Sequence, residues 1–192
     1  MSGPDDYIEV NRVAWNRRTE VHVASDFYDM PGFKAGGTSL KPFEVALLGD
    51  VVGRSILHLQ CHSGQDSLSL ARMGAEVTGV DFSDAALQVA RETADELGLS
   101  AQFVLSNVLE LNLGRTVDAV FASYGVLGWV PDVAAWMRVA AHHLSPGGAL
   151  ILVEFHPLIW LFDQQAPVDY FHSAEPDVET QKGTYTAGGG DV

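Results

Sequence analysis

The stretch from Arg54 to Ser83 constrains the fold of this chain more than any other. It reads as an apolar strand over 55–59, a polar loop over 60–66, a short helix over 67–73 and a strand over 76–80 that ends at Asp81. An apolar strand that feeds a glycine loop and a helix, with an acid after the next strand, is typical of a nucleotide-binding βαβ unit. We therefore expect an α/β fold in which Asp81 lies where a ribose would bind.

The residues of the loop in this unit distinguish between two classes of ligand. A dinucleotide fingerprint GxGxxG needs early glycines so that backbone amides can close on a pyrophosphate at the helix N-terminus. Those early positions hold Gln60 and His62, and Gly64 remains. S-adenosylmethionine (SAM) carries no phosphate, so polar loop side chains are tolerated or used for its amino-acid end, while Gly64 lets the backbone pass close to it. The loop favours SAM over NAD.

The sequence HLQCHSGQDSLSLARMGAEVTGVDFS resembles the cofactor-binding region of class I SAM-dependent methyltransferases, in a branch whose loop reads HLQCH followed by GQD. Four positions of that loop usually hold an acid and three alternating glycines in this family. Here they hold His58, Gln60, His62 and Gly64, of which Gly64 matches the family pattern. Asp81 matches the family's ribose-binding acid. The resemblance implies a Rossmann-like, mostly parallel sheet of about five strands with helices on both faces, preceded by an N-terminal helical lid.

The resemblance also implies which residues hold SAM. Asp81 would accept hydrogen bonds from the ribose hydroxyls, and Phe82 and Val108 would flank the adenine. Asn107 would lie at the adenine edge, because an amide both donates and accepts; an ordinary turn asparagine is the alternative. The whole implied set is His58, Gln60, His62, Gly64, Asp81, Phe82, Asn107, Val108 and Ser123.

Residues 1–50 are expected to form the lid, with helices over 7–23 and 42–48 and a loop over 31–39. By the resemblance, the lid residues that line the pocket are Trp15, Asn16, His22, Tyr28, Phe33 and Lys34. The alternative is that Trp15 and Phe33 only pack the helices and that His22 lies at the surface.

Residues 51–160 are expected to form the cofactor-binding core. Ser83 and Gly98 suit the two ends of a helix over 84–97. Further strands are expected over 102–105, 117–122 and 149–155, the last after a turn over 145–148. A helix opened by Pro131 is expected to place these side chains in the core: Val133, Trp136, Met137, Ala140 and Leu144.

The candidate catalytic residues are Tyr124, Glu154 and His156. The loop over 123–129 leaves the carboxyl end of a central strand, where ligands bind in open α/β sheets. Glu154 and His156 alternate on one side of an extended chain, so both can face one cleft. They could bind the acceptor or take its proton. The alternative is that Glu154 pairs structurally and His156 begins a loop.

No metal site is expected. His58, Cys61 and His62 carry metal-binding atoms, but strand alternation sends Cys61 to the side opposite His58, and no fourth ligand is evident. Cys61 is the single cysteine, so an intrachain disulfide is impossible and a reducing cytoplasm is the natural setting.

The charge balance favours small-molecule partners. With 11 Lys and Arg against 25 Asp and Glu, the formal net charge of −14 would repel a nucleic-acid duplex or an anionic membrane. The N-terminus lacks a secretory pattern, and no apolar segment approaches the ~20 residues that span a bilayer. We expect a cytoplasmic protein with a small-molecule methyl acceptor and neither nucleic-acid nor membrane partners.

Residues 161–192 read as an irregular tail without a further strand. The class I family usually closes its sheet with two more strands, which this chain is expected to lack. The uncovered sheet edge would favour a homodimer.

The leading hypothesis is a SAM-dependent methyltransferase acting on a small molecule. Two alternatives remain open: a non-catalytic or truncated SAM-fold binding protein, and an NAD-dependent oxidoreductase, which the loop disfavours. The fold alone does not choose the acceptor atom.

Overall fold

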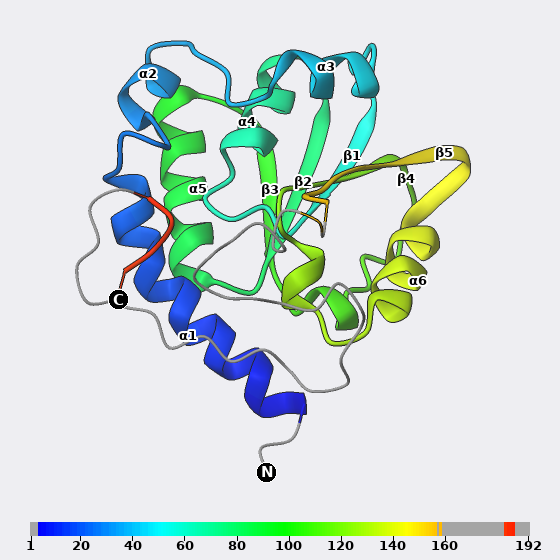
Figure 1. The fold of residues 1–192 in the computed structure, drawn as a ribbon. Helices are drawn as coiled ribbons and strands as arrows, with labels where there is room; N and C mark the ends of the chain where they lie inside the picture. The colour runs from blue at the N-terminus through cyan, green and yellow to red at the C-terminus, as the bar shows by residue number, and fades with distance from the viewer. Residues whose placement is uncertain (1–3, 157, 159–182, 187–192) are drawn as a thin grey trace.

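The computed structural model describes residues 4–156, 158 and 183–186 (Figure 1). Its centre is a parallel sheet with the strand order β3-β2-β1-β4-β5. The strands are β1 Ser55–Leu59, β2 Glu76–Asp81, β3 Ala101–Leu105, β4 Val117–Ser123 and β5 Leu144–Val153. This is the Rossmann-like α/β fold that the sequence predicts.

Six α-helices and two short 3-10 helices surround the sheet in the described part of the chain. They are α1 Pro4–Val23, α2 Met30–Lys34, α3 Pro42–Leu48, α4 Gln65–Arg72, α5 Asp84–Leu97, α6 Val133–His143, η1 Val108–Glu110 and η2 Leu127–Trp129. Figure 1 shows α1 running diagonally past α5, with α6 on the opposite side of the molecule. The helix α1 extends the expected lid helix to Pro4, and α3 lies where it was predicted.

Alternation along β1 divides the core into two layers. Leu57 and Leu59 belong to one buried cluster, which includes Trp136 of α6. Ile56 belongs to another, which includes Leu70 of α4. Because a parallel strand in the middle of a sheet is covered on both faces, nearly all of β1 is buried.

The strand order places a topological switch point between β1 and β4. From β1 the chain moves outward through β2 to β3, and then returns to add β4 and β5 on the other side. The loops that follow β1 and β4 therefore diverge from neighbouring strand ends, which is where open α/β sheets bind ligands. The fold positions the candidate site at this edge.

The helix α5 confirms both of its predicted ends. The Ser83 hydroxyl accepts a hydrogen bond from the Ala86 backbone N–H at 3.1 Å, as an N-cap does. Gly98 ends the helix with φ 61°, the left-handed conformation that glycine adopts without strain. Between these ends, Leu87 and Ala90 are fully buried.

The loop predicted over 31–39 is wrong in its first part, because the helix α2 covers Met30–Lys34. The Asp29 carboxylate accepts a hydrogen bond from Gly32 N at 3.0 Å, and Pro31 lies in the first turn. Side-chain capping therefore stabilises a helix too short for periodicity to indicate.

The strand β5 begins at Leu144, so the turn predicted over 145–148 does not precede the strand. Val117 pairs with Leu144 and Ala119 pairs with Ala149, so the intervening residues form an irregularity within the ladder. The turn residues bulge out of a strand that starts earlier than expected.

The predicted core face of α6 is only partly correct. Trp136 and Ala140 are buried as expected, but Val133 is 42% exposed and Met137 is 38% exposed. Leu144 lies outside the helix, as the first residue of β5. The buried stripe is centred on Trp136, Ala140 and His143, so the two exposed residues lie at its flank. The burial of His143 was not predicted; its Nε2 accepts a hydrogen bond from Leu113 N at 3.1 Å.

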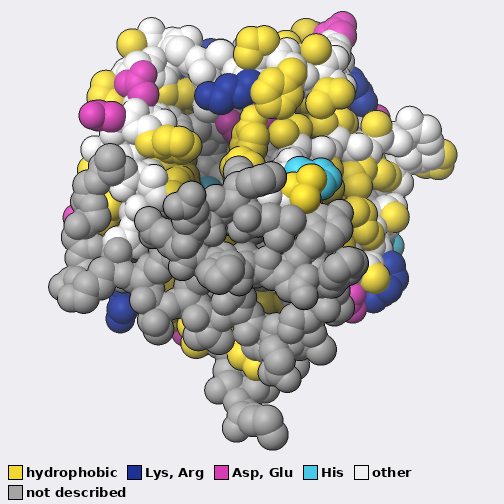
Figure 2. Space-filling view, in the orientation of Figure 1, with side chains coloured by type: hydrophobic (Ala, Val, Ile, Leu, Met, Phe, Trp, Pro, Cys, Tyr) yellow, Lys and Arg dark blue, Asp and Glu magenta, His cyan; other side chains and the backbone are white. Residues whose placement is uncertain are grey.

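The helix α3 buries a carboxylate and exposes apolar side chains. Glu44 is fully buried and its Oε2 accepts a hydrogen bond from Lys41 N at 2.5 Å. Phe43 and Leu47 are exposed, and hydrophobic atoms gather over this region of the surface in Figure 2. Burial raises the pKa of Glu44.

The expected absence of closing strands concerns residues that lie largely outside the described part of the chain. No described helix combines the length and apolar content that crossing a membrane requires.

We expect Leu87→Ala to lower the free energy of unfolding by about 2–5 kcal/mol, because it leaves a cavity at a fully buried position on α5. Urea denaturation measures the loss. Gln88→Ala, on the exposed side of the same helix, is the control and should stay within about 0.5 kcal/mol of the parent. Equal losses in the two variants would contradict the packing described here.

Candidate cofactor and acceptor site

Strained loops gather at the carboxyl edge of β1 and β4. Gln60, His62 and Tyr124 have φ angles of 54°, 50° and 54°, and Gly64 and Gly125 lie close to them in sequence with φ 75° and 80°. Positive φ is uncommon for residues other than glycine and persists only where surrounding contacts enforce it. The edge that the topology selects is therefore also the edge with local backbone strain.

Asp81 ties the loop over 60–64, which we call the cofactor loop, to the start of α5. It is 6% exposed; its Oδ2 accepts a hydrogen bond from His62 N and its Oδ1 one from Ser83 N, both at 2.8 Å. Burial raises the pKa of Asp81, while these N–H donors act in the opposite direction. A carboxylate has about four acceptor positions, so both oxygens can accept further hydrogen bonds.

The His62 ring carries unused polar atoms. Both ring nitrogens are buried, and neither has a hydrogen-bond partner in the described part of the chain. Burial, and then the nearby His22, lowers the pKa of His62 to about 3, so the imidazole is neutral near pH 7. A neutral imidazole presents one N–H donor and one acceptor, and leaving both unpaired is costly. The ring therefore fits a ligand that can both accept and donate.

Gln60 is occupied by contacts within the protein. Its Nε2 donates to the Val126 carbonyl oxygen at 2.9 Å, and its Oε1 accepts from Trp136 Nε1 at 2.8 Å. The amide braces the cofactor loop against the loop after β4 and against α6. The structure thus gives Gln60 a bracing position, and direct contact with the methionine end stays a prediction.

Gly64 is required by packing as well as by conformation. A Cβ atom at this position would lie 2.8 Å from Ala90 Cβ and 2.9 Å from the Phe103 ring. Its φ of 75° also disfavours other residues. The glycine therefore brings the loop close to α5 and β3, and its approach to a cofactor is untested.

His58 lies below the loop, inside the protein. Its Nδ1 and the Ser67 hydroxyl share a hydrogen bond of 2.8 Å, and its ring packs 4.9 Å from that of Phe121. Burial lowers the pKa of His58 to about 4. Its Nε2 is buried and has no partner among the described residues.

The predicted adenine residues lie along one edge. Asn107 Oδ1 accepts a hydrogen bond from Leu109 N at 3.1 Å and caps η1, so its oxygen has the turn role that was the alternative. Val108 is buried in the core, and Phe82 is half-buried beside Asp81. Their contact with adenine stays a prediction.

Ser123 ends β4 and contacts a residue that the sequence did not single out. Its hydroxyl donates to Asp66 Oδ2 at 3.1 Å, which joins β4 to the first turn of α4. A carboxylate in the first turn of a helix is a common stabilising pattern, so the sequence offered a signal for Asp66.

Glu154 clamps the loop after β4. Its Oε1 accepts hydrogen bonds from the backbone N–H groups of Gly125 and Phe155, and its Oε2 accepts one from Leu127 N at 3.1 Å. These contacts fit the alternative in which Glu154 has a structural role better than they fit a free general base.

Tyr124 and His156 remain accessible. Tyr124 is partly exposed, with its ring 5.7 Å from that of Phe155, and burial together with the nearby Glu44 raises its pKa. His156 is exposed, and its Nδ1 accepts a hydrogen bond from Leu158 N at 3.2 Å. No contact in the described part of the chain joins Tyr124 to His156.

Polar contacts hold the helix α1 against α5. Asn16 Nδ2 donates to Asp84 Oδ1 at 2.7 Å, and Asn16 Oδ1 accepts from the Ser83 hydroxyl at 2.6 Å. This docking brings Trp15 and His22 against His62, with ring centroids 5.4 and 5.2 Å away. The alternative of a surface position for His22 is wrong, because the residue is fully buried.

Two of the predicted lid residues lie away from this cluster. Phe33 packs in the core under the Arg72 guanidinium, which lies 4.7 Å from its ring centroid. Lys34 Nζ forms a salt bridge with Glu96 Oε2 at 2.6 Å. The packing alternative therefore fits Phe33.

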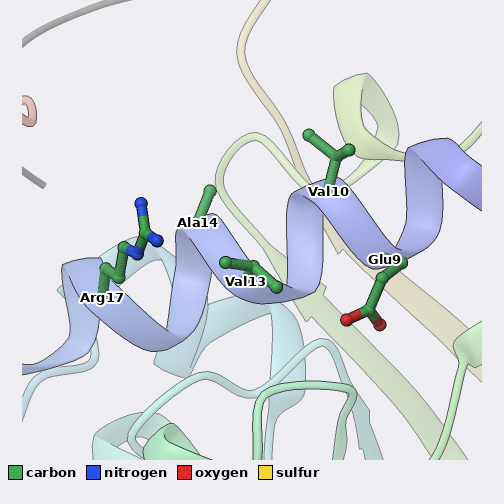
Figure 3. Close-up of a pocket in the computed structure, with 5 residues that line it drawn as sticks. All are labelled: Glu9, Val10, Val13, Ala14 and Arg17. Carbon is green, nitrogen blue, oxygen red and sulfur yellow. The ribbon is translucent and has the colours of Figure 1, made fainter.

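A hollow of about 320 Å³ lies along α1, apart from the cofactor loop (Figure 3). Its lining residues are Glu9, Val10, Val13, Ala14 and Arg17, all on one helix. It contains none of the predicted site residues. The described residues hold no cluster of three metal-binding side chains.

The sheet order, the glycine loop and the acid after β2 define a Rossmann-like fold of the kind that methyltransferases use. Residues 56–148 match the family described as a methyltransferase domain. This stretch runs from β1 into β5 and includes the loop, Asp81 and the strand ends described above. The match supports the resemblance to class I SAM-dependent methyltransferases.

Curated relatives agree with the domain match. A ubiquinone biosynthesis O-methyltransferase of Alkalilimnicola ehrlichii is 39% identical over 119 residues, which cover 60% of this chain and 48% of the relative. One from Xanthomonas oryzae pv. oryzae is 31% identical over 135 residues, covering 68% and 56%. The chain thus spans about half the length of the curated relatives it matches.

Solved structures share the fold. A SAM-dependent methyltransferase from Mesorhizobium loti is 30% identical with a TM-score of 0.56, covering 62% of this chain and 55% of that one. The complex of DhpI with S-adenosylhomocysteine (SAH) has a TM-score of 0.60 at 23% identity, covering 77% and 68%. At 23% identity, the similarity to DhpI shows a shared fold alone.

Buried histidines should make stability depend on pH. The pKa values of His22 and His58 are about 4 and that of His62 is about 3, all lowered from 6.5 by burial. The unfolded chain therefore binds more protons as the pH falls below about 6.5, and stability present above that pH is lost towards pH 4. We expect each histidine to contribute a loss of about 2 kcal/mol between pH 7 and 5, measured by urea unfolding.

The matched variants for that measurement are His58→Leu and His142→Phe. His58→Leu should flatten the pH dependence by about 2 kcal/mol. The exposed His142 is the control, and its replacement should keep the parent slope. The same slope in all three proteins would argue against the burial of a neutral His58.

Glu154→Ala should loosen the loop after β4, because three backbone N–H groups lose their acceptor. We expect a loss of about 1–3 kcal/mol of stability and faster amide hydrogen exchange at Gly125 and Leu127, measured by NMR. Glu110→Ala, at an exposed position, serves as the control. Unchanged exchange at both amides would rule out the clamp.

Proposed function

We propose that this chain binds SAM and transfers its methyl group to a small-molecule acceptor. The observation that carries the proposal is Asp81, a buried carboxylate at the end of β2 with acceptor capacity left over. It lies beside the ring of His62, whose nitrogens have no partner among the described residues. These groups suit the ribose and the amino-acid end of SAM. The domain match and the named relatives support the same activity.

Each residue has a role in this proposal. Asp81 accepts hydrogen bonds from the ribose hydroxyls. The neutral His62 faces the methionine end, whose ammonium donates hydrogen bonds and whose carboxylate accepts them. Gln60 and Gly64 hold the loop in shape. The adenine lies near Phe82, Asn107 and Val108, while His58 and Ser123 support the loop from below.

SAM supplies an electrophilic methyl group on a positively charged sulfur when it is bound. The chain contributes mainly by positioning the acceptor and excluding water, because the sulfonium charge disappears during transfer. Trp15 and Trp129, with ring centroids 5.3 Å apart, close the site from α1 and η2. A general base is needed only where the acceptor must lose a proton, and Tyr124 and His156 stay candidates. Glu154 serves the loop instead.

The finer parts of the proposal rest on the sequence. They are the HLQCH and GQD loop branch, the domain division at residues 50 and 160, a homodimer through the sheet edge and a cytoplasmic setting without nucleic-acid or membrane partners. The relatives are named O-methyltransferases, so oxygen acceptors are the first to test.

Calorimetric titration with SAM and SAH tests the cofactor. We expect Asp81→Ala to weaken SAH binding by roughly 10- to 100-fold, because hydrogen bonds to a charged group contribute about 1.5–3 kcal/mol. Asp95→Ala, at an exposed position on α5, is the control and should bind as the parent does.

Two results would count against the proposal. Binding of NADH in preference to SAH would favour the oxidoreductase alternative. A folded parent protein that binds neither ligand would favour the non-catalytic alternative.

A further inference from the structure

Residues 183–186, which we call the latch, lie against the end of α1 and the turn that follows it, although they are distant in sequence. Thr184 Oγ1 is 2.5 Å from His22 Nε2, and the hydroxyl oxygens of Tyr185 and Tyr28 are also 2.5 Å apart. Figure 1 shows the latch in red beside α1. The latch therefore joins a segment that follows β5 in the chain to the first helix.

The two side chains that the latch binds cover the ring of His62. The ring centroids of His22 and Tyr28 lie 5.2 and 5.4 Å from that of His62. Both ring nitrogens of His62 are buried, and so is Asp81, which accepts a hydrogen bond from His62 N. Buried atoms cannot meet an incoming cofactor, so part of this cover must move before SAM reaches them.

The latch contacts are weaker than those that hold α1 and the turn after it. The charged Asp84 and the Ser83 hydroxyl both bind Asn16, in the middle of α1. Gln65 Nε2 donates to the Tyr28 carbonyl oxygen at 2.7 Å and fixes the backbone of the turn to α4. The latch bonds join neutral side chains, which contribute less than pairs that include a charge. The latch is therefore expected to open before α1 or the turn does.

The middle of the latch lies at the surface, whereas its ends do not. Gly183 and Thr186 are buried, but Tyr185 between them is 61% exposed. The Tyr185 ring packs on His22 and on the exposed Phe27, with ring centroids 4.7 and 5.6 Å apart. Lifting this ring exposes little additional apolar surface, so the movement costs little hydrophobic free energy. The middle of the latch can therefore lift while its ends stay in place.

We propose that the latch gates the cofactor site: Thr184 and Tyr185 hold the side chains of His22 and Tyr28 over His62, release them as SAM enters and hold them again once it is bound. This inference rests on the proposed methyltransferase function and adds the control of cofactor exchange. The latch bonds are the same in the free and the bound protein. They therefore slow both the entry and the release of the cofactor and leave its affinity unchanged.

Stopped-flow binding and release of SAH by the full chain test the gate, followed by tryptophan fluorescence, because the Trp15 ring lies 5.4 Å from that of His62. Tyr185→Phe removes one latch bond and keeps the ring, and Thr184→Val removes the other. Each should raise the association and dissociation rate constants of SAH by about 3- to 10-fold, with the dissociation constant within about 2-fold of the parent. Tyr7→Phe, near the start of α1, is the matched control and should keep both rate constants.

The outcomes separate a gate from a direct contact and from a purely structural role. A faster dissociation alone, with a proportional loss of affinity, would mean that the latch contacts the cofactor, and it overturns the gate. Unchanged rate constants in both latch variants, whether or not urea unfolding shows a loss of stability, overturn it as well. In both cases the parent still binds SAH and the proposed function stands. A parent that binds no SAH in the calorimeter overturns the proposed function and this inference with it.

Discussion

The arrangement of the site depends on the two hydrogen bonds that Asp81 accepts from His62 N and Ser83 N. One bond fixes the strained loop after β1, and the other fixes the first turn of α5. Ser83 in turn contacts Asn16, so the docking of α1 depends on the same carboxylate. A single buried acid thus relates three elements that are distant in sequence, and the ring cluster above the loop depends on all three.

At this site the backbone N–H groups of the loops form hydrogen bonds, whereas several side-chain nitrogens form none among the described residues. The loop N–H groups named above have acceptors, whereas His22 Nδ1, His58 Nε2 and both ring nitrogens of His62 have no partner among the described residues. Burying such groups costs free energy, and neutral imidazoles lower that cost relative to charged ones. This pattern is expected of a binding site in which the framework is rigid before the ligand arrives and the ligand completes the remaining hydrogen bonds.

Local signals in the sequence were enough for the sheet, for the ends of α5 and for the position of Asp81. They failed where contacts join distant residues. Gln60 meets Val126 and Trp136, and Glu154 meets the loop after β4, through pairings that no periodicity encodes. The burial of His22 likewise depends on how α1 docks. Sequence patterns therefore located the loops at the carboxyl edge of the sheet, while the contacts that each side chain makes there required the tertiary structure.

The clamp on the loop after β4 has an evolutionary consequence. Glu154 holds this loop through the backbone N–H groups of Gly125 and Leu127, and Gln60 holds it through the Val126 carbonyl. Because every residue carries these backbone groups apart from the missing N–H of proline, the side chains at positions 126 and 127 can change without loss of the anchors, whereas the φ of 80° at Gly125 favours glycine there. The loop can therefore vary in sequence at these positions while its attachment to Gln60 and Glu154 stays constant.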